Sequence, residues 1–159
     1  MGRFSVDLEL ANNDDLALVR RGMLPPDQVR RQTIQGVVDS GAAMLMLPQV
    51  VIKQLGLPLG EKVQIRYADG RRAERREAKG VLVTLLGRED TFTAIVEPKR
   101  ATALIGAIVL EALDLLVDCQ AKRLVPRDPS GAIYEIESYS EAPESATPGL
   151  RSTADSATH

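Results

Sequence analysis

The chain has 159 residues, of which 44% are hydrophobic and 3% aromatic, and its formal net charge is −2. This length allows one domain with a core of aliphatic side chains, and the charge argues against the broad basic surface of a nucleic-acid-binding protein. A single cysteine, Cys119, excludes an internal disulfide framework and is typical of a reducing compartment. No apolar run is long enough to cross a bilayer, so we expect a cytoplasmic protein with no membrane partner.

The N-terminal part of the chain has the pattern of short strands separated by turns. Residues 4–10 alternate apolar and polar side chains with period two, which predicts a half-buried strand. Residues 12–15 are turn formers and residues 16–19 are apolar, so a hairpin is expected there. After a Pro-Pro break, residues 29–38 contain the β-branched residues Thr33, Ile34, Val37 and Val38 and are a second predicted strand.

The middle of the chain predicts one helix and two hairpins. Residues 47–57 contain a proline suited to a first helical turn and a glycine suited to a C-terminal cap. Residues 63–67 alternate again, and the Asp-Gly pair at 69–70 is a strong hairpin signal. The return segment, residues 71–86, is charged at first and then apolar, and residues 91–96 follow a further turn as the next strand.

The C-terminal part predicts a second helix and two strands. Residues 107–116 are mostly apolar and are the expected helix, followed by strands over residues 117–125 and 133–136. Cys119 is expected to be a small buried residue of the first of these strands. From residue 138 the composition shifts to Ser, Thr, Ala, Pro and Glu. We therefore expect an all-β, barrel-like or sandwich-like domain over residues 1–137 and a disordered tail over residues 138–159.

The residue types present leave few kinds of chemistry open. The sole histidine, His159, is the last residue of the expected tail, so neither a Ser-His-Asp triad nor a Cys-His dyad has a base. One cysteine and one histidine cannot form a usual zinc site, and no phosphate-binding loop follows a strand. We expect no metal and no cofactor. General acid–base chemistry by carboxylates remains, and it usually takes two of them.

Asp39 is the carboxylate in the most informative position. It directly follows the apolar residues 36–38 and precedes a run of small residues, 40–43. Small residues allow another backbone to approach closely, and the N–H of Gly41 can face a carboxylate. On these residues alone, a turn-forming aspartate at a strand end and a catalytic aspartate both stay open.

Two motifs together resemble the retropepsin-like aspartic proteases, the retroviral-type proteases of clan AA, in a single-domain bacterial-type form. The first is VVDSGAAMLMLP at residues 37–48, where the family has hydrophobic residues and then Asp-Thr/Ser-Gly-Ala. The second is ALIGAIVLEAL at residues 103–113, where the family has two hydrophobic residues and a glycine that open a short helix. The resemblance covers residues 4–136. It implies a closed β-barrel of the retropepsin type, with a flap hairpin over residues 63–83 and one or two short helices.

The resemblance also implies roles for individual residues. Asp39 would be the catalytic residue, and a single Asp-Ser-Gly copy implies a homodimer whose two Asp39 side chains meet at a two-fold axis. Terminal strands, here residues 5–10 and 133–136, would join that interface. The residues implied to support the active-site loop are Ser40, Gly41, Ala42, Leu104, Ile105 and Gly106. The residues implied to form the substrate-binding flap are Tyr67, Ala68, Asp69 and Gly70.

The activity implied is that of an aspartic endopeptidase, which hydrolyses a peptide or unfolded protein with a water activated by the paired Asp39 carboxylates. A non-catalytic dimeric barrel that binds peptides is one alternative. An unrelated small β-domain, with an accidental Asp-Ser-Gly turn, is another. The basic residues at 71–76 are interpreted as a solvated strand face, and steering of acidic peptides is the other interpretation.

Overall fold

The computed structural model describes residues 3–137, and the tail predicted over residues 138–159 lies outside the described residues. The strands are β1 (Phe4–Asn12), β2 (Arg31–Val38), β3 (Leu45–Pro48), β4 (Leu59–Arg66), β5 (Arg72–Leu85), β6 (Arg88–Glu97), β7 (Ala103–Ile105), β8 (Leu115–Asp118) and β9 (Arg123–Pro126). The helical elements are α1 (Asn13–Arg20), the 3₁₀ turn η1 (Pro26–Gln28), α2 (Gln49–Leu55) and α3 (Ala107–Ala112).

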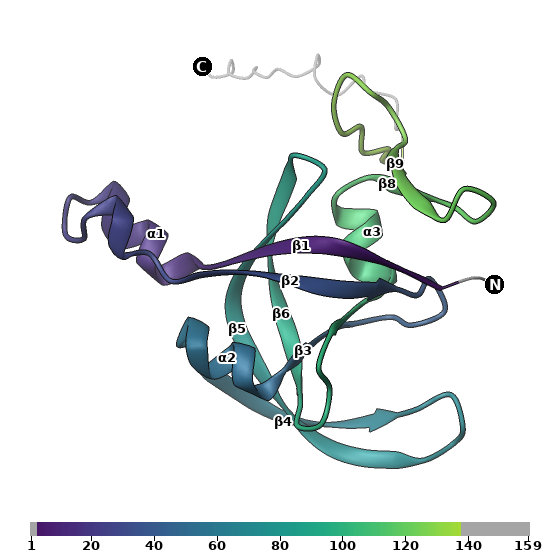
Figure 1. Ribbon diagram of the computed structural model, residues 1–159, viewed down its shortest axis with the longest axis horizontal. Helices are drawn as coiled ribbons and strands as arrows, with labels where there is room; N and C mark the ends of the chain where they lie inside the picture. The colour runs from purple at the N-terminus through teal and green to yellow at the C-terminus, as the bar shows by residue number, and fades with distance from the viewer. Residues whose placement is uncertain (1–2, 138–159) are drawn as a thin grey trace, which may run out of the picture.

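The main sheet closes on itself. Its strand order is β1-β2-β7-β3-β6-β5-β4, and β1 also pairs with β5. This second pairing joins the two sides of the sheet into a barrel, with β4 left outside as an extension of β5 (Figure 1). The sequence prediction of a closed, all-β barrel with short helices is confirmed.

One long strand, β5, serves both the barrel and the hairpin that extends from it. Its first half pairs with β4, from Arg72 to Ala78, and its second half pairs with β1, from Val81 to Thr84. Between the halves the pairing with β6 shifts register, and Gly80 has a φ of +73°. Because this left-handed backbone favours glycine, the strand bends here and the β4–β5 hairpin leaves the barrel wall (Figure 1).

The barrel interior is filled with aliphatic side chains, as the low aromatic content requires. Strands β1, β3, β5 and β7 and helices α2 and α3 all contribute to one continuous cluster. Side chains in this cluster that are fully shielded from solvent include those of Leu8, Leu45, Leu47, Leu55, Val81, Val83, Ile105 and Val109. Burial of this apolar surface is the main stabilising term of the fold.

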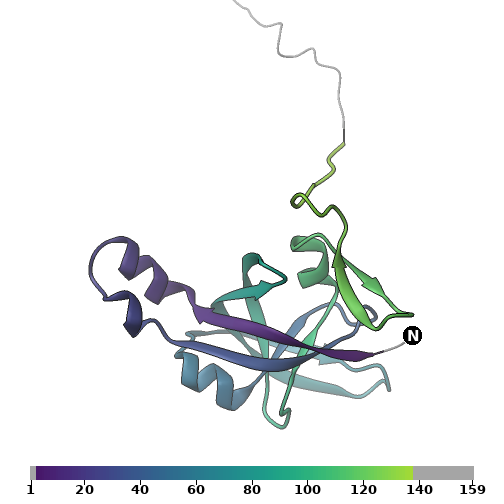
Figure 2. The ribbon, with the colours of Figure 1, turned by 45° about the horizontal axis from the view of Figure 1, so that its top comes forward.

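The prediction of a hairpin around residues 12–19 is wrong, because residues 13–20 form helix α1. The side chain of Asn12 accepts a hydrogen bond from the backbone N–H of Asp15 at 2.9 Å and so caps the helix. Asn and Asp favour both turns and helix N-termini, and here the capping role prevails. Helix α1 and η1 project from one end of β1, opposite the N-terminus (Figures 1 and 2).

The strand predicted over residues 117–125 is in fact a two-strand hairpin, β8–β9. The carboxylate of Asp118 accepts from the N–H of Ala121 at 3.0 Å, and Lys122 has a φ of +55°, so the chain reverses between them. Cys119 lies in this turn and is exposed rather than buried. The helix predicted over residues 107–116 ends at Ala112, and Asp114 has a φ of +56°, so the chain leaves the helix there and enters β8.

Residues 133–136 are not a strand. The segment is held to the end of α3 by two contacts instead. The N–H of Ile133 donates to Asp114 at 2.9 Å, and the hydroxyl of Tyr134 donates to the carbonyl of Ala112 at 2.5 Å. No helix within residues 3–137 is both long and apolar enough to span a membrane.

Candidate active site

Strand β7 lies between β2 and β3, and this arrangement positions the Asp-Ser-Gly loop. β2 runs parallel to β7, with Val38 opposite Ile105, and β3 runs antiparallel to it, with Leu45 opposite Ile105. The loop at residues 39–44 must therefore pass over the end of β7. Two segments far apart in the sequence are brought into contact by this crossing.

Gly106 is the point of closest approach in this crossing. A Cβ atom at this position would lie 2.4 Å from the carbonyl oxygen of Met44 and 2.7 Å from that of Ala42. The first amide groups of α3 then donate to the loop, from Ala107 to the carbonyl of Ala42 at 2.8 Å and from Ile108 to that of Ala43 at 3.0 Å. The second sequence motif therefore acts as a rigid support for the first.

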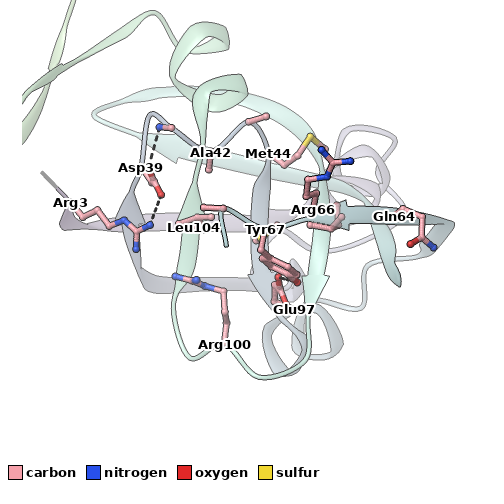
Figure 3. Close-up of a pocket in the computed structure, with 15 residues that line it drawn as sticks. Arg3, Asp39, Ala42, Met44, Gln64, Arg66, Tyr67, Glu97, Arg100 and Leu104 are labelled. Atoms are coloured by element: carbon pink, nitrogen blue, oxygen red, sulfur yellow. Dashed lines mark hydrogen bonds and ion pairs between the residues drawn. The ribbon is translucent and has the colours of Figure 1, made fainter. Parts of the chain in front are cut away.

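Asp39 follows the last residue of β2 and is held through its backbone. Its N–H donates to the carbonyl of Ile105 at 3.0 Å, and its own carbonyl accepts from the N–H of Ala42 at 3.0 Å. The carboxylate accepts a hydrogen bond from the N–H of Gly41 at 3.0 Å on Oδ1. Oδ2 pairs with the guanidinium of Arg3 at 2.9 Å, and the Asp39 side chain is 20% exposed (Figure 3).

The Asp39 loop forms one wall of a cleft of about 480 Å³. The opposite wall is the end of the β4–β5 hairpin, and the floor includes Leu104 and Met46. In Figure 3, the Asp39–Arg3 pair lies at one end of the cleft and Gln64 and Arg66 at the other. The residues that line the cleft from the hairpin are Gln64, Ile65, Arg66, Tyr67 and Ala68.

A polar cluster fixes the turn end of the hairpin in the cleft. The hydroxyl of Tyr67 donates to Glu97 at 2.5 Å, and the guanidinium of Arg75 contacts both Glu97 and the Tyr67 oxygen at 3.2 Å. Burial, together with the hydrogen bond to Glu97, raises the pKa of Tyr67 above 10.0, so the phenol stays a hydrogen-bond donor. Figure 3 shows Tyr67 and Glu97 side by side in the cleft.

The sequence pattern did not predict this polar cluster. Arg75 belongs to the basic run at residues 71–76, interpreted above as a solvated face, yet its side chain is only 22% exposed and is paired with Glu97. The alternation of β5 places Arg75 on the opposite face from its neighbours, which the period of a strand could have indicated. The remaining arginines of the run, Arg71, Arg72 and Arg76, are exposed.

The predicted site residues divide into two groups. Those that line the cleft together with Asp39 are Gly41, Ala42, Leu104, Tyr67 and Ala68. Ile105 and Gly106 are buried behind the loop, Ser40 is exposed on its outer side, and Asp69 and Gly70 lie at the turn of the hairpin beyond the cleft lining. The turn is closed by the N–H of Arg71, which donates to Asp69 at 2.9 Å.

Glu97 is the second carboxylate of the cleft, and it is already fully engaged. Its oxygens accept from Tyr67 and Arg75, and its side chain is 9% exposed. Among residues 3–137, no group of three or more His, Cys, Asp or Glu side chains is arranged to hold a metal ion. Within a single chain, Asp39 is therefore the carboxylate of the cleft that a substrate or water can reach.

No family model matches the chain, and no curated protein matches it. Among solved structures, it is similar to EIAV protease, determined in complex with the inhibitor HBY-793. The identity is 18% and the TM-score 0.47, and the match covers 70% of this chain and 88% of the protease chain. A likeness at this level carries no conclusion about activity.

Proposed function

We propose that this chain is an aspartic endopeptidase that acts as a homodimer, with water activated by the two Asp39 carboxylates. The observation that carries the proposal is the position of Asp39. Its carboxylate lies at the edge of a cleft, on a loop fixed by Ile105 and Gly106 behind it, and faces a hairpin that can cover an extended peptide. A rigid carboxylate beside an open cleft is the arrangement that general acid–base catalysis requires.

The homodimer follows from the count of available carboxylates. Peptide hydrolysis by this chemistry needs two carboxyl groups, and the other carboxylate of the cleft, Glu97, is engaged by Tyr67 and Arg75. A second copy of the chain supplies the missing group as its own Asp39. The exposed apolar residues Ile108, Leu116 and Ile133, which are 44%, 47% and 46% exposed, lie on α3, β8 and the segment held to them, and supply a surface that a partner subunit can cover.

The mechanism depends on the proximity of two like charges. Two carboxylates in contact cannot both ionise at low cost, so the pair shares one proton, as in aspartic proteases generally. The ionised carboxylate takes a proton from a water, whose oxygen attacks the peptide carbonyl carbon, while the protonated carboxyl donates to the carbonyl oxygen. When the tetrahedral intermediate collapses, the C–N bond breaks and the leaving nitrogen takes up a proton.

The loop and hairpin have supporting roles in this proposal. The N–H of Gly41, already bonded to Asp39, holds the carboxylate plane, and the exposed hydroxyl of Ser40 can bond across the two-fold axis. The β4–β5 hairpin acts as the flap and binds the substrate as an added strand through its main chain. Tyr67 and Ala68 are the flap residues that face the cleft, and Asp69 and Gly70 form the tip of the flap.

A non-catalytic peptide-binding module is the second candidate. The observation that favours it is the ion pair between Arg3 and Asp39, which occupies one carboxylate oxygen at 2.9 Å. Such a module would use the same cleft and the same dimer, with Asp39 as a structural or peptide-binding group.

Cleavage of an unfolded protein by wild type and by Asp39→Asn separates these candidates. We expect wild type to cleave within the range of about pH 3 to about 7, and the substitution to reduce the rate by about 100-fold or more, since it removes the general acid and base. Asp27→Asn, an exposed change in η1, is the matched control and leaves cleavage unchanged. Sedimentation is expected to give twice the mass of one chain. Equal cleavage by wild type and Asp39→Asn would refute the protease proposal.

A further inference from the structure

A second pocket, of about 560 Å³, adjoins the cleft and is strongly basic. It shares Tyr67, Glu97 and Arg100 with the cleft, so these three side chains lie between the two spaces or border both. Its remaining polar lining consists of Arg71, Arg75 and Lys99. Of the described residues that line it, four are cationic and only Glu97 is anionic.

The one carboxylate of this pocket does not balance these cations. Glu97 is paired with Arg75 at 3.2 Å and accepts from Tyr67, so its charge is already compensated. Within residues 3–137, no ion pair joins Lys99 or Arg100 to a carboxylate. Among the described residues, Arg71 forms one ion pair, with Asp69 at a long distance of 3.8 Å, and both side chains are largely exposed. The pocket therefore presents an excess of positive charge to whatever enters it.

Two of these guanidinium groups are held in place. Arg100 donates from Nε to the carbonyl of Thr102 at 2.8 Å and from Nη2 to the hydroxyl of Thr102 at 3.3 Å. Neither of these two hydrogen bonds uses Nη1. The guanidinium of Arg71 lies 4.1 Å from the ring centroid of Tyr67, and Tyr67 is itself fixed by Glu97. A guanidinium stacked on a fixed ring loses little freedom when it binds a carboxylate.

The position of this basic pocket beside the Asp39 cleft indicates the class of ligand that it binds. A peptide bound as an extended strand along the β4–β5 hairpin presents alternate side chains to the same face, so a side chain a few residues from the cleaved bond can enter the adjoining pocket. We infer that this pocket selects substrates with a glutamate or aspartate near the cleaved bond, whose carboxylate binds Arg71, Lys99 and Arg100. This inference rests on the proposed peptidase function, and it adds the class of substrate.

A two-fold axis extends the inference to both sides of the cleaved bond. Each subunit of the proposed dimer contributes one such pocket, and the axis passes between the two Asp39 side chains. Peptides with acidic residues on both sides of the bond are therefore expected to bind more tightly than peptides with one, because both pockets are filled.

The first test compares matched peptides that differ only in Glu against Gln at positions flanking the cleaved bond. We expect wild type to cleave the Glu peptides with a kcat/KM about tenfold or more above that for the Gln peptides, since charge-assisted hydrogen bonds are lost with Gln. The preference should shrink as salt is raised, because salt screens partly exposed charges. Cleavage of both peptides at equal rates would overturn the acidic preference and leave the peptidase proposal standing.

The second test assigns the preference to the pocket. Arg71→Gln alone, and with Arg100→Gln, should reduce the Glu-over-Gln ratio of kcat/KM to about threefold or less. Arg123→Gln, a change of the same charge on exposed β9, is the matched control and should keep the full ratio. Arg71 is exposed and its substitution is compatible with folding, so this arm remains informative if the Arg100 variant does not fold.

The third test separates the failure of this inference from failure of the proposed function. Anisotropy of fluorescent Glu and Gln peptides is measured on full-length Asp39→Asn, which is expected to bind without cleavage. Tighter binding of the Glu peptide, lost with Arg71→Gln, supports the acidic pocket even if wild type cleaves nothing. Equal binding of both peptides, or equally tight binding of a single-stranded oligonucleotide, would show general attraction of anions and overturn it.

Discussion

Substitution of Gly106 by alanine tests whether the second motif supports the Asp39 loop. The backbone of Gly106, with φ −94° and ψ −174°, is extended and suits any residue, so only the space decides the outcome. An added Cβ would lie 2.4 Å from the Met44 oxygen, 2.7 Å from the Ala42 oxygen and 2.8 Å from the Ala43 carbonyl carbon. All three are backbone atoms, which cannot swing away as the end of a side chain can.

The cost follows from the movement that the methyl group requires. An ordinary contact needs about 1 Å of separation beyond the present 2.4 Å, and this would break the hydrogen bonds from Ala107 and Ile108 to the loop, now 2.8 and 3.0 Å long. Each lost bond is worth about 0.5–1.5 kcal/mol, and overpacking adds about 1–3 kcal/mol. We therefore expect Gly106→Ala to lower the free energy of unfolding by about 2–6 kcal/mol.

Gly36→Ala is the matched control, because the same methyl group there meets a side chain. Its Cβ would lie 2.7 Å from Cδ1 and 3.2 Å from Cγ1 of Ile105, which are side-chain atoms that a change of rotamer can shift, so a cost at the lower end of the overpacking range, about 1 kcal/mol, is expected. The assay is urea unfolding of both variants and wild type at one protein concentration, since association would otherwise change the apparent stability. A loss for Gly106→Ala no larger than that for Gly36→Ala would refute the reasoning.

Two further predictions concern hydrogen-bonded polar side chains. The hydrogen bond from Arg30 holds the pKa of Asp15 below 3.8 in the folded chain, so the folded state binds fewer protons than the unfolded state and stability is lost as the pH falls below 3.8. Asp15→Asn should cost about 1–3 kcal/mol at neutral pH and flatten the fall of the melting temperature in acid, and an unchanged slope would contradict this. Tyr67→Phe removes the 2.5 Å bond to Glu97 and should cost about 1–2 kcal/mol. In a spectrophotometric titration, the difference between wild type and the variant should be a tyrosine that ionises above 10.0, and a difference centred at or below 10.0 would exclude the cluster.

The parts of the fold that the sequence predicted have local signals. The alternation in β1, the Asp-Gly turn of the β4–β5 hairpin and the glycine cap of α2 each depend on neighbouring residues. Gly56, at the end of α2, has the expected left-handed backbone, with a φ of +64°. The short strands β3 and β7 have no such signal, because three or four apolar residues become strands only through partners elsewhere in the chain.

The candidate site likewise has one part with a local sequence signal and one part that depends on distant partners. The Asp-Ser-Gly loop and the glycine that supports it were predicted from two short motifs, and the structure brings them into contact at Gly106. The Tyr67–Glu97–Arg75 cluster was not predicted, since its members come from three segments and each alone is typical of a surface strand. Paired charges of this kind appear only when the register of β5 and β6 is known.

The ion pair between Arg3 and Asp39 is compatible with the proposed dimer, because the pair is weak and the two Asp39 side chains would together carry one negative charge. Arg3 is 66% exposed, and an exposed pair of this kind contributes about 0–1 kcal/mol, which is too little to hold the carboxylate away from a partner. Two Asp39 side chains that share one proton carry one negative charge between them, and each chain brings one Arg3 to that charge. The N–H of Gly41 holds Oδ1 from the loop, while Oδ2, paired only weakly with the exposed Arg3, stays available to a partner. The single chain therefore already fixes the orientation of the group that dimerisation would pair.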